Sequence, residues 1–205
     1  MRPPGTPMPG PPAAAAAARN VEVKARVASV EALLPRARAL ADGPPEPIAQ
    51  DDTFFACAQG RLKLRDFGDG QGELIAYERA DVAGARTSHY RRVPVPDPAA
   101  LRDALAASLG VIGRVRKRRL LLKIGRTRVH LDRVDGLGDF LELEVVLREG
   151  EDEAPGRAEA GALLAALGLG DAPLLAPAYL DLLQATPASP PGAGSGSPSI
   201  DPAPT

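Results

Sequence analysis

The sequence predicts an α+β protein, an antiparallel β-barrel with a charged lumen and helices packed outside. Strand-like alternation of polar and apolar residues recurs in six to eight segments. Helical periodicity appears in three or four others, without the regular strand-helix alternation of a doubly wound fold. The charged residues of successive strands also share one face, opposite the apolar face that the helices must cover. A sheet of seven or eight such strands curls and can close with its charged face inside.

The predicted strands follow one another in mostly sequential antiparallel order. They are expected at residues 20–27, 60–66, 73–79, 85–95, 116–124, 126–134 and 139–148. Pro94 weakens the segment at 85–95, because proline removes a hydrogen-bond donor from a sheet. Glycines between strands supply hairpin-like turns at Gly125 and in residues 68–72 and 136–138.

The clearest helix start combines a capping residue with a proline. Asp97 is the expected N-cap and Pro98 the first helical residue of a helix over 99–109, which Gly110 ends. Further helices are expected at residues 29–42, 157–167 and 178–184. The last two are predicted to form a helical hairpin. In the first, Pro35 must lie at a kink or near the start.

One folded domain is expected at residues 20–184. The chain has 205 residues, and its ends differ in composition from the rest. Residues 1–19 are mainly Pro, Gly and Ala, and residues 185–205 are mainly Pro, Ser, Gly and Ala. Such segments cannot bury enough apolar area to offset their ordering entropy, so both are expected to be disordered tails. The remaining length suits a single domain.

Composition excludes several classes of site. Cys57 is the only cysteine, which excludes a disulfide framework and a thiolate metal site, and with two histidines a zinc site of His and Cys is disfavoured. Any metal is therefore expected to be a hard cation held by oxygen. No long apolar segment indicates a membrane span, so a soluble, cytoplasmic protein is expected. The net charge of −1 disfavours nucleic acid as a partner, and the oligomeric state, monomer or homodimer, is left open.

The inward faces of the predicted strands carry charges of both signs. They include Asn20, Glu22, Lys24, Arg61, Lys63, Arg65, Tyr77, Arg79, Lys117, Arg119, His130, Asp132, Glu142 and Glu144. On any one strand this is an ordinary solvated face, but its recurrence along the chain favours an interior. Desolvated charges must be paired, which favours a polyanionic ligand together with divalent cations. Lys and Arg bind phosphate oxygens, while carboxylates hold Mg²⁺ or Mn²⁺.

These residues resemble the CYTH superfamily, the triphosphate tunnel metalloenzymes, over nearly all of residues 20–184. The similarity is greatest to the class IV adenylyl cyclase branch, which is related to thiamine triphosphatase. It is carried by 20-NVEVK-24, which is similar to the family's Glu-x-Glu-x-Lys signature, and by 61-RLKLR-65, 77-YERA-80, 116-RKRR-119, 130-HLDRVDGLGDFLELE-144 and 179-YLDLL-183. The resemblance implies an eight-stranded antiparallel tunnel.

The resemblance also implies a role for each charged position. Residues that would bind the triphosphate are Lys24, Arg61, Lys63, Arg65, Arg79, Lys117 and Arg119. Carboxylates that would face Mg²⁺ or Mn²⁺ are Glu22, Asp132, Glu142 and Glu144. Lys24, Glu22 and Glu144 are the implied catalytic residues. The sequence departs from the signature at Asn20, where the family carries Glu, so a metal ligand there is uncharged.

Three functions remain open from the sequence. A cyclase would convert ATP to cyclic AMP and pyrophosphate, whereas a hydrolase would release the terminal phosphate of an organic triphosphate or of inorganic triphosphate. The third is a non-catalytic module that binds triphosphate or polyphosphate, for which Asn20 is the main argument. His130 shares a face with Asp132 and is either a lumen ligand, a proton shuttle or a hydrogen-bonded structural residue.

Overall fold

The structure, a computed structural model, describes residues 18–79 and 86–185, without the side chains of Ala18, Arg79 and residues 86–89. Apart from residues 18, 19 and 185, the expected tails lie outside this description. The described elements are β1 (Ala18–Arg26), α1 (Val30–Leu40), β2 (Glu46–Phe55), β3 (Arg61–Asp66), β4 (Gly72–Arg79), β5 (Arg86–Val95), α2 (Pro98–Leu109), β6 (Val111–Ile124), β7 (Thr127–Val134), β8 (Gly138–Val146), α3 (Glu153–Ala166) and α4 (Tyr179–Ala185). None of the described helices is long and apolar enough to cross a membrane.

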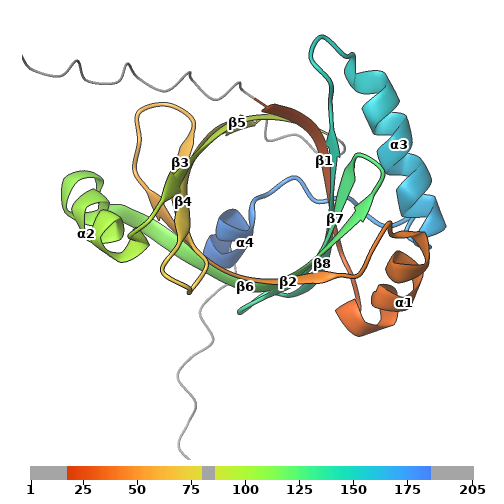
Figure 1. Cartoon of the computed structure of the whole chain (residues 1–205), viewed down its shortest axis with the longest axis horizontal. Coiled ribbons are helices and arrows are strands. Elements are labelled where there is room, and N and C mark those ends of the chain that lie inside the picture. Colours follow the sequence, from red (N-terminus) through yellow and green to blue (C-terminus); the bar gives the residue numbers. More distant parts are fainter. Residues whose placement is uncertain (1–17, 80–85, 186–205) are drawn as a thin grey trace, which may run out of the picture.

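The strands form a closed antiparallel barrel in the order β1-β5-β4-β3-β2-β6-β7-β8 (Figure 1). β1 closes the ring because it pairs with β5 on one side and with β8 on the other. Across the β1–β8 seam, Glu22 lies opposite Glu144 and Lys24 lies opposite Glu142. The predicted fold class is therefore confirmed. The seam that closes the barrel brings charged residues of the first strand next to charged residues of the last.

The sequence did not predict β2, which lies between β3 and β6. Its sequence is EPIAQDDTFF, with a proline and two adjacent acids, residue types that strands generally avoid. The last four residues are buried whichever way they point, so the strand lacks an alternating pattern. Asp52 faces the lumen, whereas its neighbour Asp51 forms an ion pair with Arg114 on the outer surface.

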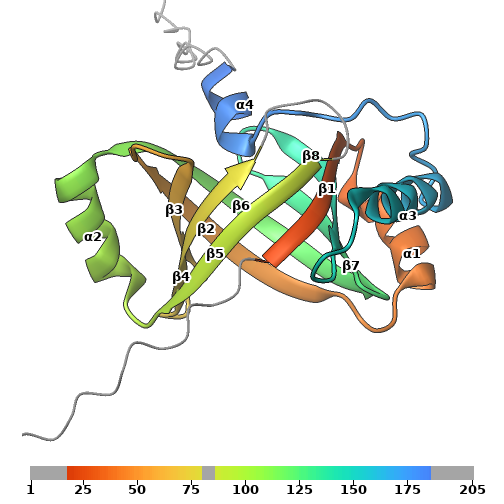
Figure 2. The same cartoon turned by 90° about the horizontal axis from the view of Figure 1, so that it is seen from above.

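Two helical layers cover the outside of the barrel (Figure 2). α1 and α3 pack on the side formed by β1, β7 and β8, in a core that includes Val23, Leu143 and Leu164. α2 packs on β2 and β3, where Leu64 and Phe55 are buried. α2 begins at Pro98 with Asp97 as its N-cap, as predicted. Outward apolar residues are therefore covered by helices, which leaves the inward positions to the charged residues.

The predicted hairpin of the last two helices is wrong. α3 packs on the barrel wall, whereas α4 lies across one end of the barrel (Figures 1 and 2). The apolar residues of α4 explain this position, because Tyr179 and Leu180 are buried together with Phe54 at that end. Gly113 of β6 makes room for Leu180, whose Cδ1 would clash with any Cβ at that position. α4 therefore closes one end of the lumen.

Candidate functional site

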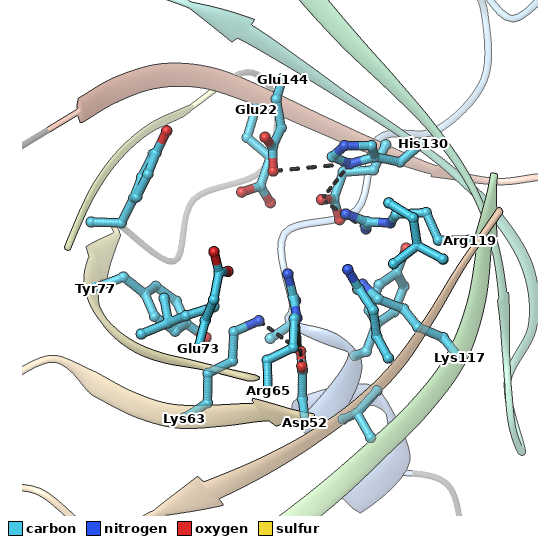
Figure 3. A pocket seen from close by; sticks show the side chains of 18 of the residues that line it. Glu22, Asp52, Lys63, Arg65, Glu73, Tyr77, Lys117, Arg119, His130 and Glu144 are labelled. Carbon is cyan, nitrogen blue, oxygen red and sulfur yellow. Dashed lines mark hydrogen bonds and ion pairs between the residues drawn. The ribbon is translucent and has the colours of Figure 1, made fainter. Parts of the chain in front are cut away.

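The lumen of the barrel contains a cavity of about 260 Å³, lined by side chains from all eight strands and from α4. Because side chains alternate along a strand, every second residue of each strand points inward. Figure 3 shows Glu22, Glu144 and His130 on one side of this cavity, with Asp52, Lys63 and Arg65 on the opposite side. The lumen thus presents cations and carboxylates to one enclosed space.

One group of cations is held by Asp52. Lys63 donates to Asp52 Oδ2 over 2.8 Å, and Arg65 donates from Nε to Oδ1 over 2.7 Å and from Nη2 to Oδ2 over 2.8 Å. Burial works to raise the pKa of the Asp52 carboxyl, but Arg65 and Lys63 hold it well below its usual range. Burial and the Arg65 charge lower the pKa of Lys63 to about 8. The carboxylate thus fixes two cations with their charge only partly balanced.

A second group repeats this arrangement around Asp132. Arg119 donates from Nε and Nη2 to the two carboxylate oxygens, each over 2.6 Å, and the Lys117 Nζ lies 3.2 Å from Oδ2. The Tyr179 hydroxyl donates to the same oxygen over 3.0 Å. Burial opposes the charge of Asp132, yet Arg119 and Lys117 keep its pKa well below the usual range. Two Lys-x-Arg pairs, each clamped by one buried aspartate, therefore face the lumen.

The resemblance implies a metal-facing role for Asp132, and the structure places this residue among the cations. Its side chain is fully buried and does not line the cavity. Its Oδ2 is in contact with Arg119, Lys117 and Tyr179, and its Oδ1 accepts a hydrogen bond from Arg119. Asp132 therefore acts in this structure as an anchor for cations.

A group of metal-ligand type lies beside the Asp132 group and consists of His130 of β7 with Glu142 and Glu144 of β8. One ligand atom of each lies within 4.8 Å of the others. The His130 Nδ1 is 3.4 Å from Glu142 Oε1 and 3.9 Å from Glu144 Oε1. Burial works to raise the pKa of Glu142, but Lys24, His130 and Arg119 hold it well below its usual range. The carboxylates are therefore ionised, as metal ligands must be.

Asn20 adds an unpaired oxygen to the same cavity. The Asn20 side chain is 2% exposed, and its Oδ1 accepts no hydrogen bond from any residue that the structure describes. β1 places it two residues before Glu22, on the lumen-facing side. A buried amide oxygen without a donor is costly and is satisfied by a cation. His130, Glu142 and Glu144 make a donor set that fits a divalent metal ion, and Asn20 lies further along the same face of β1, one inward position beyond the Glu22–Glu144 pair.

The structure brings most of the sequence-predicted site residues into one cavity. Those that line it are Glu22, Lys24, Lys63, Arg65, Lys117, Arg119, Glu142 and Glu144, with Asn20. Arg61 does not line the cavity, and its Nη1 instead forms a 2.9 Å ion pair with Asp181 of α4. The side chain of Arg79 lies outside the described residues.

Sequence reasoning missed several lumen residues. Asp52 was missed together with its strand. Glu73 lies on the same face of β4 as Tyr77, and Arg92 lies on the same face of β5 as Tyr90, so alternation was the signal that could have identified both. Arg92 and Glu73 form an ion pair, with 3.8 Å between Arg92 Nη1 and Glu73 Oε1. Tyr179 begins the segment 179–183 that contributes to the family resemblance, but it reaches the lumen only because α4 lies across the end of the barrel.

Comparisons with solved structures place this fold among known ones. The PH1012 protein of Pyrococcus horikoshii OT3 superposes with a TM-score of 0.72 at 24% identity, over 80% of this chain and 99% of that one. An adenylate cyclase candidate from Vibrio parahaemolyticus has a TM-score of 0.64 at 21% identity, over 81% and 98%. An adenylyl cyclase candidate from Hippeastrum, reported to have a dominant triphosphatase activity, has a TM-score of 0.60 at 13% identity, over 82% and 95%.

A second comparison uses the sequence itself. No curated protein matches the chain. The family model of the CYTH domain matches residues 18–179, from the first residue of β1 to the first residue of α4. This range contains all eight strands and therefore the whole lumen. The chain accordingly belongs to the CYTH domain family.

Proposed function

We propose that the protein is a metal-dependent enzyme that acts on the triphosphate of a nucleotide or another organic triphosphate, and that its reaction is the adenylyl cyclase reaction of class IV, ATP to cyclic AMP and pyrophosphate. The observation that carries the proposal is that two Lys-x-Arg groups, Lys63 with Arg65 and Lys117 with Arg119, share one cavity with several carboxylates. The carboxylate wall is the part of this cavity formed by Glu22, Glu142 and Glu144 of β1 and β8. Phosphate oxygens pair with the Lys and Arg side chains, and a divalent cation pairs with the carboxylates, so a metal-bound triphosphate balances both kinds of charge.

The residues of the lumen divide the work of this reaction. The Lys-x-Arg groups bind the phosphate oxygens and neutralise charge that builds up on the leaving pyrophosphate. Lys24, whose Nζ is 3.5 Å from Glu142 Oε2, donates to the triphosphate from the carboxylate wall. Glu22, opposite Glu144 at the β1–β8 seam, is the group that accepts a proton from the attacking hydroxyl. Bound Mg²⁺ or Mn²⁺ supplies Lewis acidity toward the phosphoryl oxygens.

The cyclase step balances within this arrangement. The ribose 3′-oxygen forms a bond to the α-phosphorus, and the bond from that phosphorus to the oxygen bridging to the β-phosphate breaks. Pyrophosphate leaves with the electron pair, and the hydroxyl proton passes to a carboxylate. α4 closes one end of the lumen and limits the access of water from that side.

Hydrolysis of the triphosphate is the second candidate. The Hippeastrum protein, a candidate cyclase with the same fold, is reported to have a dominant triphosphatase activity. Hydrolysis uses the same cations and metal, with water as the nucleophile at the terminal phosphate. It requires no contact with a nucleoside, so it also accommodates thiamine triphosphate or inorganic tripolyphosphate.

Product analysis tests the proposal. The purified protein is incubated with ATP, thiamine triphosphate and tripolyphosphate, each with Mg²⁺ or Mn²⁺, and the products are separated by chromatography. Cyclic AMP with pyrophosphate is the expected result, and free phosphate with a diphosphate would replace the cyclase by the hydrolase. If triphosphate binds and no substrate gives a product, the protein is a non-catalytic binding module and the enzymatic proposal fails.

The substitution Asn20→Glu should raise turnover. It restores a carboxylate at the buried oxygen that now lacks a partner among the described residues, and should increase Mg²⁺ affinity about tenfold. Initial rates over a Mg²⁺ titration measure this. The control is Gln59→Glu, which adds a carboxylate at an exposed position outside the cavity and should not raise turnover. Unchanged or lower activity in Asn20→Glu would show that the missing charge at Asn20, where the family signature has Glu, does not limit metal binding.

Affinity for tripolyphosphate should fall by about tenfold as the pH rises from 7 to 9.5, because Lys63 then loses the charge of one hydrogen-bond donor. The pKa of Lys63 is lowered to about 8, so its cationic form is complete below that pH and is lost above it. Calorimetric titration without metal measures the affinity. Lys63→Arg stays charged at this position throughout and should show a smaller fall over the same range. An equal fall in that variant would assign the pH dependence to another group.

A further inference from the structure

The spacing of the ligand atoms on the carboxylate wall suits one metal ion. Two ligand atoms bound to the same cation at about 2.1 Å are separated by roughly 3.0 to 3.4 Å in octahedral or tetrahedral geometry. The His130 Nδ1 lies 3.4 Å from Glu142 Oε1, and Glu144 Oε1 lies 3.9 Å from the same nitrogen. The three ligand atoms lie within 4.8 Å of one another, so a shift of the Glu144 side chain would bring all three onto one ion.

The contacts of Glu142 differ from those of the other buried carboxylates in the lumen. Its oxygens lie 3.4 Å from His130 and Arg119 and 3.5 Å from Lys24, longer than a charge-assisted hydrogen bond of about 2.8 Å. Arg119 instead holds Asp132 over 2.6 Å. Glu142 is therefore buried but held closely by none of these groups, as suits a ligand for a cation.

Asn20 gives an independent indication of a cation in this cavity. Its Oδ1 is an acceptor only, it is buried, and it receives no hydrogen bond from the described part of the chain. Its strand neighbour Glu22 pairs with Glu144 across the seam, so the amide belongs to the same side of the lumen. An oxygen of this kind is stabilised by a positive charge brought into the cavity.

We propose that His130 is a metal ligand, through Nδ1, together with one carboxylate oxygen from each of Glu142 and Glu144, and that the site consequently binds Mn²⁺ or Co²⁺ more tightly than Mg²⁺. The inference rests on the metal dependence in the proposed function and adds the identity of a ligand and the class of ion. It replaces the expectation from composition that oxygen alone holds the metal.

The preference follows from ligand chemistry. Mg²⁺ binds oxygen ligands and keeps several waters, whereas first-row transition-metal ions accept imidazole nitrogen, with affinity rising from Mn²⁺ to Co²⁺. To ligate the ion, His130 presents the Nδ1 lone pair and carries its hydrogen on Nε2.

The experiment is electron spin echo spectroscopy of Mn²⁺ bound to the full chain after removal of metals with a chelator. A directly bound imidazole gives a nitrogen modulation of the echo, and Mn²⁺ and Mg²⁺ affinities are obtained by titration of the same samples. The variants are His130→Gln and, as the matched control, His89→Gln. His89 is the other of the two histidines. Its backbone lies in β5, which pairs with neither β7 nor β8, the strands that carry the proposed ligands.

The expected result is a nitrogen signal in the wild type and in His89→Gln that is lost in His130→Gln, with Mn²⁺ affinity falling about tenfold or more and Mg²⁺ affinity changing less. If the wild type binds Mn²⁺ without a nitrogen signal, the inference is overturned, while an oxygen-only site and the proposed function remain. If neither Mn²⁺ nor Mg²⁺ binds in the presence or absence of tripolyphosphate, the metal dependence of the proposed function fails as well. The wild-type spectrum decides between these results even if His130→Gln does not fold.

Discussion

The substitution Glu144→Gln should abolish metal-dependent turnover, with a loss of at least about 100-fold. Glu144 is close to His130, and its Oε2 lies 3.1 Å from the Arg128 Nε. Its burial raises the pKa, but His130 and Arg128 outweigh the effect, so the carboxylate is ionised. Glutamine keeps the size and one oxygen but removes the charge that the metal requires. Turnover with saturating triphosphate and a titration of Mn²⁺ measure the effect.

The control for this variant is Glu149→Gln. Glu149 lies in the exposed segment after β8, so the same chemical change there should leave turnover at the wild-type value. Circular dichroism should show the same fold in both variants, since Glu144 does not provide the apolar packing of the barrel. If Glu144→Gln keeps full activity, the carboxylate wall does not hold the catalytic metal.

The substitution Asp52→Asn should destabilise the protein strongly. It leaves Lys63 and Arg65 buried without their counter-charge, which costs about 3–5 kcal/mol in the free energy of unfolding. For a chain of this size that corresponds to a fall of roughly 6–20 °C in the melting temperature. Asp51→Asn is the matched control, because Asp51 is adjacent and forms its ion pairs on the outer surface, where such pairs contribute about 0–1 kcal/mol.

An anion should partly rescue the Asp52→Asn variant. Tripolyphosphate binds beside the two unbalanced cations and replaces the missing negative charge, so it should raise the melting temperature of the variant more than that of the wild type. The depressed pKa of Asp52 gives the sign of a second effect. Its stabilising contribution is complete above the unfolded pKa of about 3.9 and is lost in acid, so the two proteins should converge in stability as the pH falls. Equal stabilisation of both proteins by the anion would contradict the lumen assignment of Lys63 and Arg65.

The lumen was predictable from the sequence where strands alternate. In β3 and β6, the period of two put Lys63, Arg65, Lys117 and Arg119 on one face, and the structure places all four in the cavity. Alternation fixes the face of a strand but not its partner. The face of Asp132 was predicted in this way, but its pairing opposite Arg119, which makes it an anchor for that cation, was not.

Two parts of the site could not be predicted from the sequence. β2 is buried on both faces near its end, so no alternation reveals that Asp52 points inward. The sequence of α4 is apolar on one side, which predicted that it packs against another helix. Only the closed barrel provides the apolar end, around Phe54 and Gly113, on which α4 packs. Both β2 and α4 are buried by strands that are distant in the sequence. Burial of this kind leaves no pattern in the neighbouring residues from which it could be predicted.

The most direct test of the account is a calorimetric titration of tripolyphosphate into the wild type and into two variants of neighbouring arginines on β6. Arg119 lines the lumen, whereas Arg118 is exposed on the outer face of the same strand. We expect one tripolyphosphate per chain, with affinity reduced about 100-fold by Arg119→Gln and unchanged by Arg118→Gln, each variant first being checked for a native fold. No binding by the wild type, or equal binding by both folded variants, would contradict a triphosphate site in the lumen.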